Sequence, residues 1–359
     1  MIGISGGRWR FIFVKKTKWK KLFNALFLIV VFCVTLWSVF RGQDFRQVLF
    51  YLSTADPLYI VPSIICVILF ILGESVIIHY LMRTLGTKVK VSHCCLYSFI
   101  GFFYSCITPS ASGGQPMQIV AMRKDKIPVA VSTVVLAIIT IVYKAVLVMI
   151  GVTIMILRPP VLMHYLEPVQ ILMYIGIGLN IVCIAALLLL VFQPEVVRFL
   201  AKKFLILWNW IRPCRDHQRQ TNRLENILGQ YKGTAEFFRS HKVVILRVFL
   251  ITLLQRIILF LITWFTYKAF NLSGHSMLLI ISLQVMISVA ADMLPLPGGM
   301  GVSENLFLTI FPAIFGAELV LPGMMISRGI SFYTQLILCG IMTIVASFIL
   351  KEKREKGRR

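Results

Sequence analysis

Long apolar stretches constrain this chain more than any other feature, because they are long enough to cross a membrane as helices. A helix needs about 20 apolar residues to cross roughly 30 Å of hydrocarbon. Six full spans are expected, near residues 22–40, 57–82, 128–157, 169–192, 243–270 and 324–350. Only 14% of the residues are charged, whereas about a quarter are charged in a soluble domain. The sequence therefore predicts an all-α polytopic membrane protein, with residues 1–359 forming a single integral membrane domain.

Two Gly- and Pro-rich segments interrupt the apolar sequence. TPSASGGQP occupies residues 108–116, and LPLPGGMGVSE occupies residues 294–304. Inside a helix, Gly costs about 1 kcal/mol and Pro about 3 kcal/mol relative to Ala. In a bilayer, each backbone group that leaves a helix must also find another partner. Two such breaks, one in each half of the chain, predict a shared structural role.

Short helical arms flank the first break. Residues 93–107 would form a helix only about 22 Å long, and few apolar residues follow Pro116 before the basic segment 123–126. Neither arm is long enough to span a membrane, so we expect a re-entrant hairpin near residues 93–122 that turns at Gly113-Gly114. A second hairpin is expected near residues 277–315. The alternative is that both breaks are ordinary tight turns between helices.

The positive charge gives the expected orientation in the membrane. The net charge is +23, and most Lys and Arg lie in five segments. These segments are residues 1–21, 83–92, 123–126, 193–242 and 351–359. Basic loops are retained on the cytoplasmic side of membranes, so we expect a multi-pass protein of the cell membrane with both termini in the cytoplasm. The basic residues are dispersed and come without a recognition motif, so a nucleic-acid partner is not expected.

The order of spans and hairpins repeats along the chain. Residues 1–157 are expected to form two spans, a hairpin and a third span, and residues 169–350 repeat this order. The first repeat begins on the cytoplasmic side of the membrane and the second on the external side. This order is typical of an inverted-topology repeat, in which broken helices build a substrate site near the midplane. Helix ends at such a site favour anionic groups.

Ionisable residues at membrane depth are costly and often functional. The candidates are Glu74, Lys144, Arg247, Arg256, Asp292, Glu304 and Arg328. In one interpretation, Arg328 and its counterpart Lys144 bind a phosphate at the hairpin tips. In the other, Arg328 pairs with Glu304 or Asp292 and only stabilises the fold. Glu304 could also cap its helix together with Ser303, and Glu74 could pair with Lys144.

The remaining motifs favour no enzyme class. The chain has no nucleotide-binding P-loop, no HExxH and no G-x-S-x-G motif, and its His and Cys residues show no metal-site spacing. No disulfide, metal or other cofactor is expected. In the basic cytoplasmic loop 193–242, residues 195–211 resemble an interfacial amphipathic helix. Residues 222–242 are predicted to form a polar helix that docks under the bundle.

The two breaks carry a resemblance to a known family. TPSASGGQPMQ, followed by a basic turn, and LPLPGGMGVSEN, followed by a span with Arg328, resemble the transmembrane region of lysylphosphatidylglycerol synthases. This flippase-like membrane family includes many stand-alone proteins, and the resemblance extends over essentially the whole chain. The substrate-site residues that it implies are Pro109, Gly113, Gly114, Gln115, Pro116, Pro297, Gly298, Gly299, Gly301, Glu304 and Arg328. Many relatives carry a Glu-Arg pair after the first hairpin, where this chain has Tyr143-Lys144, so the family's ionic pairing is not expected there.

The resemblance implies a lipid transporter whose partner is a membrane lipid. That lipid is expected to be an anionic phospholipid, an aminoacylated phospholipid or a polyprenyl-linked lipid. Full-length synthases add a cytoplasmic domain that transfers lysine from aminoacyl-tRNA to phosphatidylglycerol. Only nine residues follow the last expected span, so we expect no such domain. Two alternatives stay open: a phosphatidylglycerol lysyltransferase-type enzyme acting on a lipid headgroup, or an accessory subunit of a cytoplasmic or membrane lipid-modifying enzyme.

Overall fold

The computed structural model describes residues 50, 53, 55–108, 111–193, 195–199, 201, 203, 217–294, 299 and 301–350. The expected span at 22–40, together with Pro109, Pro297 and Gly298, lies outside these residues. Every regular element within them is helical. Five helical stretches in this part of the chain are long and apolar enough to cross a membrane: Pro57–Thr84, Val129–Leu157, Pro160–Phe192, Lys242–Ala269 and Val320–Ile349. They coincide with five of the six expected spans, and the chain is a membrane protein.

The helices fall into three groups by length and position. The long ones are α3 (Pro57–Thr84), α6 (Val129–Leu157), α8 (Gln170–Phe192) and α11 (Lys242–Ala269), followed by the last stretch, which consists of α15 (Val320–Arg328), η2 (Gly329–Thr334) and α16 (Gln335–Ile349). Beside the breaks lie α4 (Val91–Ile107), α5 (Gly114–Lys124), α12 (Met277–Ala291), α13 (Val302–Ile310) and α14 (Pro312–Phe315). The connecting helices are α7 (Pro160–Leu166), η1 (Glu167–Val169) and α10 (His217–Ser240).

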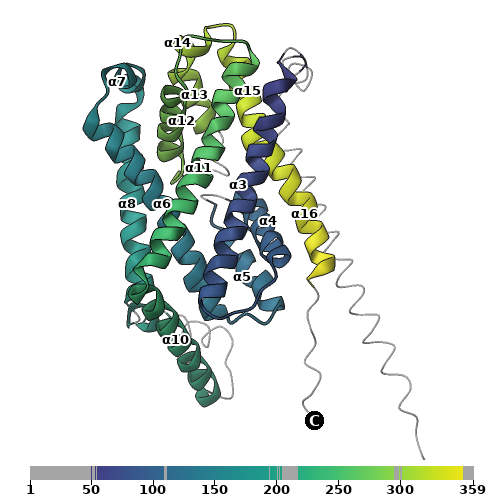
Figure 1. The fold of residues 1–359 in the computed structure, drawn as a ribbon. Helices are drawn as coiled ribbons and strands as arrows, with labels where there is room; N and C mark the ends of the chain where they lie inside the picture. Colours follow the sequence, from purple (N-terminus) through teal and green to yellow (C-terminus); the bar gives the residue numbers. More distant parts are fainter. Residues whose placement is uncertain are drawn as a thin grey trace, which may run out of the picture.

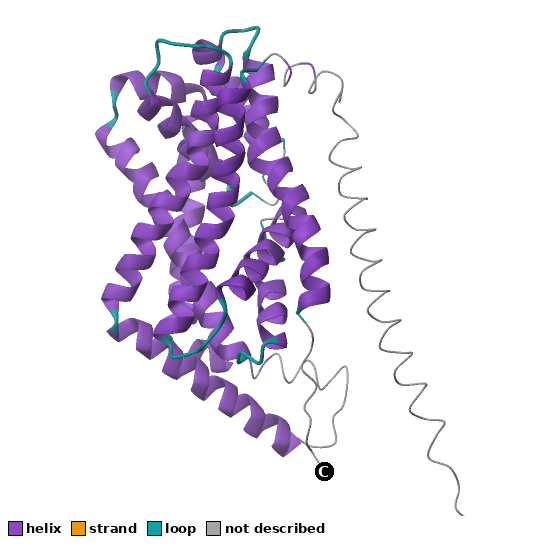
Figure 2. Cartoon of the chain, turned by 45° about the vertical axis from the view of Figure 1, so that its right-hand side comes forward, coloured by secondary structure: helices purple, strands orange, loops and turns teal. Residues whose placement is uncertain are grey.

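The long helices run side by side, and the two broken segments lie at different heights among them (Figure 1). The pair α4 and α5 occupies the lower half of the bundle, whereas α12 and α13 occupy the upper half. Helix α10 crosses the lower end, opposite α7 and α14 (Figures 1 and 2). At the centre, α3 packs against α11, while α4 packs against α16 and α12 packs against α6. Each broken segment therefore packs against the last long helix of the other half of the chain.

Local sequence explains where the helices begin. The α3 helix follows Asp56, whose Oδ1 accepts a hydrogen bond from the backbone N–H of Leu58 at 2.9 Å. Pro57 occupies its first position, where a missing N–H costs nothing. The α12 helix begins after Ser276, whose hydroxyl oxygen accepts from the N–H of Leu279 at 3.2 Å. These side chains satisfy backbone donors that a helix leaves unpaired at its start.

Two segments differ from the sequence-based expectation. Residues 158–168, which lie between two expected spans, are mostly helical as α7 and η1. The last span begins at Val320 and contains the π-helix η2 directly after Arg328. Short π segments occur mostly inside α-helices and frequently at functional sites. Nothing in the hydropathy of residues 324–350 indicates this change of helix type.

The α10 helix confirms the polar helix predicted in the basic loop. It packs against α6, α8 and α11. The buried Tyr231 connects α10 to α8: its hydroxyl donates a hydrogen bond to the carbonyl oxygen of Leu190 at 2.8 Å. Burial raises the pKa of Tyr231. In the expected interfacial helix, residues 195–199 are helical, and most of the remainder lies outside the described residues.

Candidate functional site

The first break joins α4 to α5. Thr108 stabilises it: its hydroxyl donates to the carbonyl of Tyr104 at 2.6 Å and accepts from the N–H of Gly113 at 2.9 Å. Ala111 adopts a left-handed conformation with φ 54°. The sequence predicts the turn at Gly113-Gly114; Gly113 does lie in the turn, whereas Gly114 is already the first residue of α5.

Close packing, rather than an unusual backbone angle, explains the two glycines. A Cβ added to Gly114 would lie 2.7 Å from the carbonyl oxygen of Gly101 on α4. A Cβ on Gly113 would lie 2.6 Å from Cγ2 of Thr108. The amide of Gly113 already bonds Thr108, and that of Gly114 points to the carbonyl of Ala111 at 3.4 Å. The glycines allow α4 and α5 to touch, and their role as substrate ligands stays a prediction.

The two outer ends of this helix pair are joined. Nδ1 of His93, near the start of α4, lies 2.7 Å from Oδ2 of Asp125, which follows α5. Tyr97 donates its hydroxyl proton to the same carboxylate oxygen. Both ends therefore lie at the lower end of the bundle, as Figure 1 shows for α4 and α5.

At the second break, glycine is required for its backbone conformation. Gly299 and Gly301 have φ values of +66° and +81°, a region that L-residues with a Cβ rarely adopt. The N–H of Ser303 donates to the carbonyl of Gly299, and that of Asn305 to the carbonyl of Gly301, each at 3.0 Å. These bonds form the first turn of α13 directly after the break.

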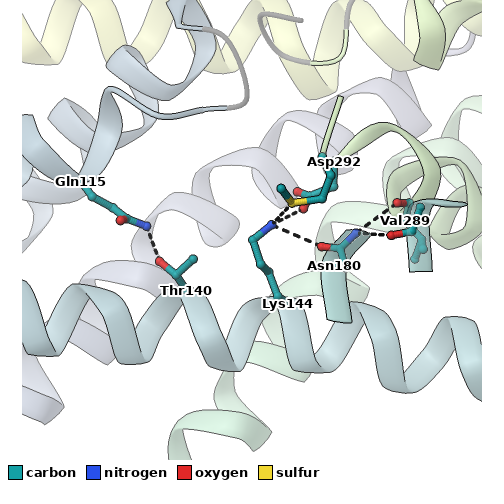
Figure 3. Close-up of polar contacts among 8 residues, drawn as sticks. Gln115, Thr140, Lys144, Asn180, Val289 and Asp292 are labelled. Atoms are coloured by element: carbon teal, nitrogen blue, oxygen red, sulfur yellow. Dashed lines mark hydrogen bonds and ion pairs between the residues drawn. The ribbon is translucent and has the colours of Figure 1, made fainter. Parts of the chain in front are cut away.

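Two ion pairs hold the two sides of the second break. Lys144 Nζ on α6 lies 2.5 Å from Oδ2 of Asp292, the residue after α12. Arg328 Nε at the end of α15 lies 2.8 Å from Oε1 of Glu304, in the first turn of α13. In Figure 3, Lys144 points toward Asp292 and Asn180, whose Oδ1 accepts a hydrogen bond at 3.3 Å. The two cations thus bind the same broken segment from opposite sides.

These contacts decide between the alternatives for the buried charges. The expected pairing of Arg328 with Glu304 is confirmed. Glu74 does not pair with Lys144: its Oε1 accepts from Nε2 of Gln118 at 2.6 Å. The capping role expected for Ser303 and Glu304 is wrong, because the N-cap of α13 is Gly301 and no side chain bonds there.

Two adjoining cavities lie between the breaks. A cavity of about 210 Å³ is lined by Ala111 of the first break, Gly299 of the second, and Arg328. A cavity of about 280 Å³ is lined by Gln115 and Lys144, among others. The residues common to both linings are Ala111, Tyr143, Arg256, Leu259 and Asp292. The side chain of Gln115 points away from the break toward Thr140 on α6, to which it donates a hydrogen bond (Figure 3).

The structure therefore brings together only part of the predicted site. Gln115, Lys144, Gly299 and Arg328 line the cavities, whereas Gly113, Gly114, Pro116, Gly301 and Glu304 are absent from both linings. Gly301 instead borders a groove beside the first turn of α8. Glu304 contacts the cavity lining indirectly, through its ion pair with Arg328.

One central residue was not assigned to the site from the sequence. Arg256 on α11 borders both cavities, but the sequence identifies it only as a charge at membrane depth. A usable signal was present, since Thr252, Gln255 and Arg256 place three polar side chains on one face of an apolar helix. All three also line the larger cavity.

Comparison with known proteins agrees with this architecture. The model of the family described as "Lysylphosphatidylglycerol synthase TM region" matches residues 24–339. No curated protein matches the chain in a sequence comparison. The matched segment includes both breaks, all five described spans except the end of the last, and every residue that lines the two cavities. The chain therefore belongs to the family of lysylphosphatidylglycerol synthase transmembrane regions.

Proposed function

We propose that this protein moves an anionic or aminoacylated phospholipid between membrane leaflets, with the lipid headgroup passing through the central cavities. The observation that carries this proposal is that both breaks border one cavity, through Ala111 and Gly299. Three basic side chains, Lys144, Arg256 and Arg328, line it and its neighbour. Ionisable side chains inside an apolar bundle usually face its interior or a water-filled cavity and often mark a substrate path.

The size of the cavities favours a headgroup over a whole lipid. Their volumes of about 210 and 280 Å³ are below the roughly 300–1,000 Å³ of pockets that enclose drug-sized ligands. A glycerophosphate group is compact and polar, whereas acyl chains are already well solvated by the bilayer. In this proposal, the headgroup occupies the cavities while the chains stay in the surrounding hydrocarbon.

An inverted repeat with two re-entrant hairpins is part of the proposal. Helix contacts support it. If each helix of the first half is replaced by its counterpart in the second half, and the reverse, the observed contacts are replaced by other observed contacts. The contact of α3 with α4 corresponds to that of α11 with α12, and the contact of α4 with α16 to that of α12 with α6. The contact of α5 with α6 corresponds to that of α13 with α15. The proposal also includes an orientation with the α10 end of the bundle and both termini in the cytoplasm, and a location in the cell membrane; the basic segments support this orientation.

The test is leaflet exchange of labelled phosphatidylglycerol in vesicles that contain the purified protein. Gly299→Leu should abolish exchange, because it forces an unfavourable φ and fills the cavity. Arg328→Ala should also reduce exchange. Since it leaves Glu304 without its ion-pair partner, the double variant Arg328→Gln with Glu304→Gln provides a charge-balanced comparison.

The matched control for Gly299→Leu is Gly178→Leu on α8, because a Cβ at Gly178 meets no atom within 4 Å. Its exchange rate should equal that of the wild type. Absence of exchange by folded wild-type protein with several anionic lipids would contradict the proposal. A lipid-headgroup transferase or an accessory subunit of a lipid-modifying enzyme would then be the better assignment.

A further inference from the structure

Arg256 has an unusual environment for a buried cation. It lies near the middle of α11 and borders both cavities. Its Nε is buried and has no hydrogen-bond partner among the described residues. The same holds for the hydroxyl of Thr252, one turn earlier on the same face of the helix. Buried polar groups are almost always hydrogen-bonded in folded proteins, so two exceptions beside one cavity require an explanation.

Aromatic rings position the guanidinium without using its donors. The Cζ atom of Arg256 lies 3.9 Å from the ring centroid of Tyr143 and 5.0 Å from that of Phe70. A cation–π contact places the cation over the face of an aromatic ring and needs no hydrogen-bond acceptor. The N–H groups of a guanidinium radiate from the edge of its plane. The rings therefore hold the group without an oxygen or nitrogen acceptor, and the Nε–H is left without a hydrogen-bond partner among the described residues.

No carboxylate oxygen of the described residues lies within 4.0 Å of a guanidinium nitrogen of Arg256. Glu74 attracts it electrostatically from a greater distance, and its Oε1 accepts a hydrogen bond from Gln118. Lys144 and Arg328, in contrast, each contact an acid of the second break. Among the described cations that line these two cavities, Arg256 is thus the one whose charge is not neutralised by direct contact with an acid.

We propose that Arg256 and Thr252 form the phosphate-binding subsite of the cavities, and that Lys144 and Arg328 serve mainly to hold the second break in place. Guanidinium groups bind phosphate oxygens through two parallel hydrogen bonds, and the Thr252 hydroxyl supplies one further donor. The ligand class is a phosphate ester or free phosphate. Its assignment to a lipid rests on the function proposed above.

Ligand-dependent thermal stabilisation of the purified full-length protein in detergent tests this subsite. Three probes are titrated: dihexanoyl phosphatidylglycerol, inorganic phosphate, and dioctanoylglycerol, which lacks phosphate. The phosphatidylglycerol probe should raise Tm of the wild type with a measurable Kd, whereas dioctanoylglycerol should not. Arg256→Gln should raise that Kd by about tenfold or more, because charge-assisted hydrogen bonds are lost. The Kd of Arg256→Lys should lie between those of the wild type and Arg256→Gln, since Lys keeps the charge but not the bidentate geometry.

The control is Arg247→Gln, because Arg247 is exposed on the same helix and borders neither cavity. Its Kd should equal that of the wild type. If Arg256→Gln fails to fold, the double variant Arg256→Gln with Glu74→Gln takes its place. It removes both members of this long-range charge interaction, so neither charge is left alone in the interior. An unchanged Kd in the folded Arg256 variant overturns the subsite.

The assay separates this inference from the function on which it rests. Arg256-dependent binding of inorganic phosphate, without binding of phosphatidylglycerol, would overturn the lipid assignment and identify free phosphate as the ligand. Leaflet exchange that proceeds normally in Arg256→Gln would leave the transport function standing and contradict the role of Arg256. Arg256-dependent lipid binding without leaflet exchange would support the subsite and contradict transport.

Discussion

Breaking the ion pair between Lys144 and Asp292 should destabilise the protein far more than removing both of its members. The pair joins α6 to the residue after α12, and the two side chains are only 9% and 15% exposed. The single variants are Lys144→Met and Asp292→Asn, and the double variant combines them. Lys144→Met also removes the donor to Asn180 Oδ1, so it should be the more harmful of the two.

The expected size of this effect follows from the geometry. Two unit charges at the 2.5 Å separation of this pair attract by about 7 kcal/mol at an effective dielectric constant of about 20. Desolvation of the two groups offsets much of that attraction. Removing one partner of a buried pair therefore typically costs about 3–5 kcal/mol, whereas replacing both with uncharged groups is often close to neutral. Each single variant should lose about 3–5 kcal/mol, and the double variant should recover most of that loss.

Unfolding of the purified protein by SDS in mixed micelles provides the measurement, analysed as a double-mutant cycle. The control cycle uses Arg198→Gln and Glu225→Gln, because this pair is 3.8 Å apart and more than half exposed on both sides. Its coupling energy should lie below about 1 kcal/mol. Additive losses in the Lys144 and Asp292 cycle would show that the two charges do not stabilise each other, and would refute the reasoning.

Three further variants test other parts of the structure. Gly114→Ala should lower the unfolding free energy by about 1–3 kcal/mol through overpacking, whereas Gly178→Ala, which meets no atom within 4 Å, should leave it unchanged or raise it in the same SDS titration. Gly301→Ala should cost about 1–2 kcal/mol from its positive φ alone, because nothing lies within 4 Å of the added Cβ; an equally stable variant in SDS unfolding would contradict that backbone angle. Tyr231→Phe removes the bond to Leu190 and should lower the unfolding free energy by about 1 kcal/mol, with faster amide hydrogen exchange in α10; unchanged exchange would show that this bond does not hold the helix.

Hydrophobicity and helix-breaking residues were sufficient to locate the described spans and the helical arms beside the first break. The expected span at 57–82 corresponds to α3, and the short arms around residues 108–116 correspond to α4 and α5. These features depend on local properties, namely how far an apolar run extends and where Gly or Pro ends it. The position of the left-handed residue in the first break could not be predicted in this way. It is Ala111, whereas glycine, the residue that adopts this conformation most readily, occupies positions 113 and 114.

The pairing of buried charges was less accessible from the sequence. Glu74 and Lys144 were plausible partners because they lie in the same half, but Lys144 pairs with a residue 148 positions away. Such a contact depends on how the two halves pack, and one sequence gives little information about that. Arg256 shows the same limit, since its polar helix face was visible but the cavity beside it required the fold.

The two ion pairs of the second break also bear on how the bundle can move. Lys144 connects that segment to α6, and Arg328 connects it to α15. Since separating either pair would leave buried charges without their partners, we expect α6, the second break and α15 to move as one rigid body. The tip of the first break is joined to α6 by a neutral hydrogen bond from Gln115 to Thr140. We therefore expect relative motion to concentrate there, which makes the first break the hinge side of the molecule.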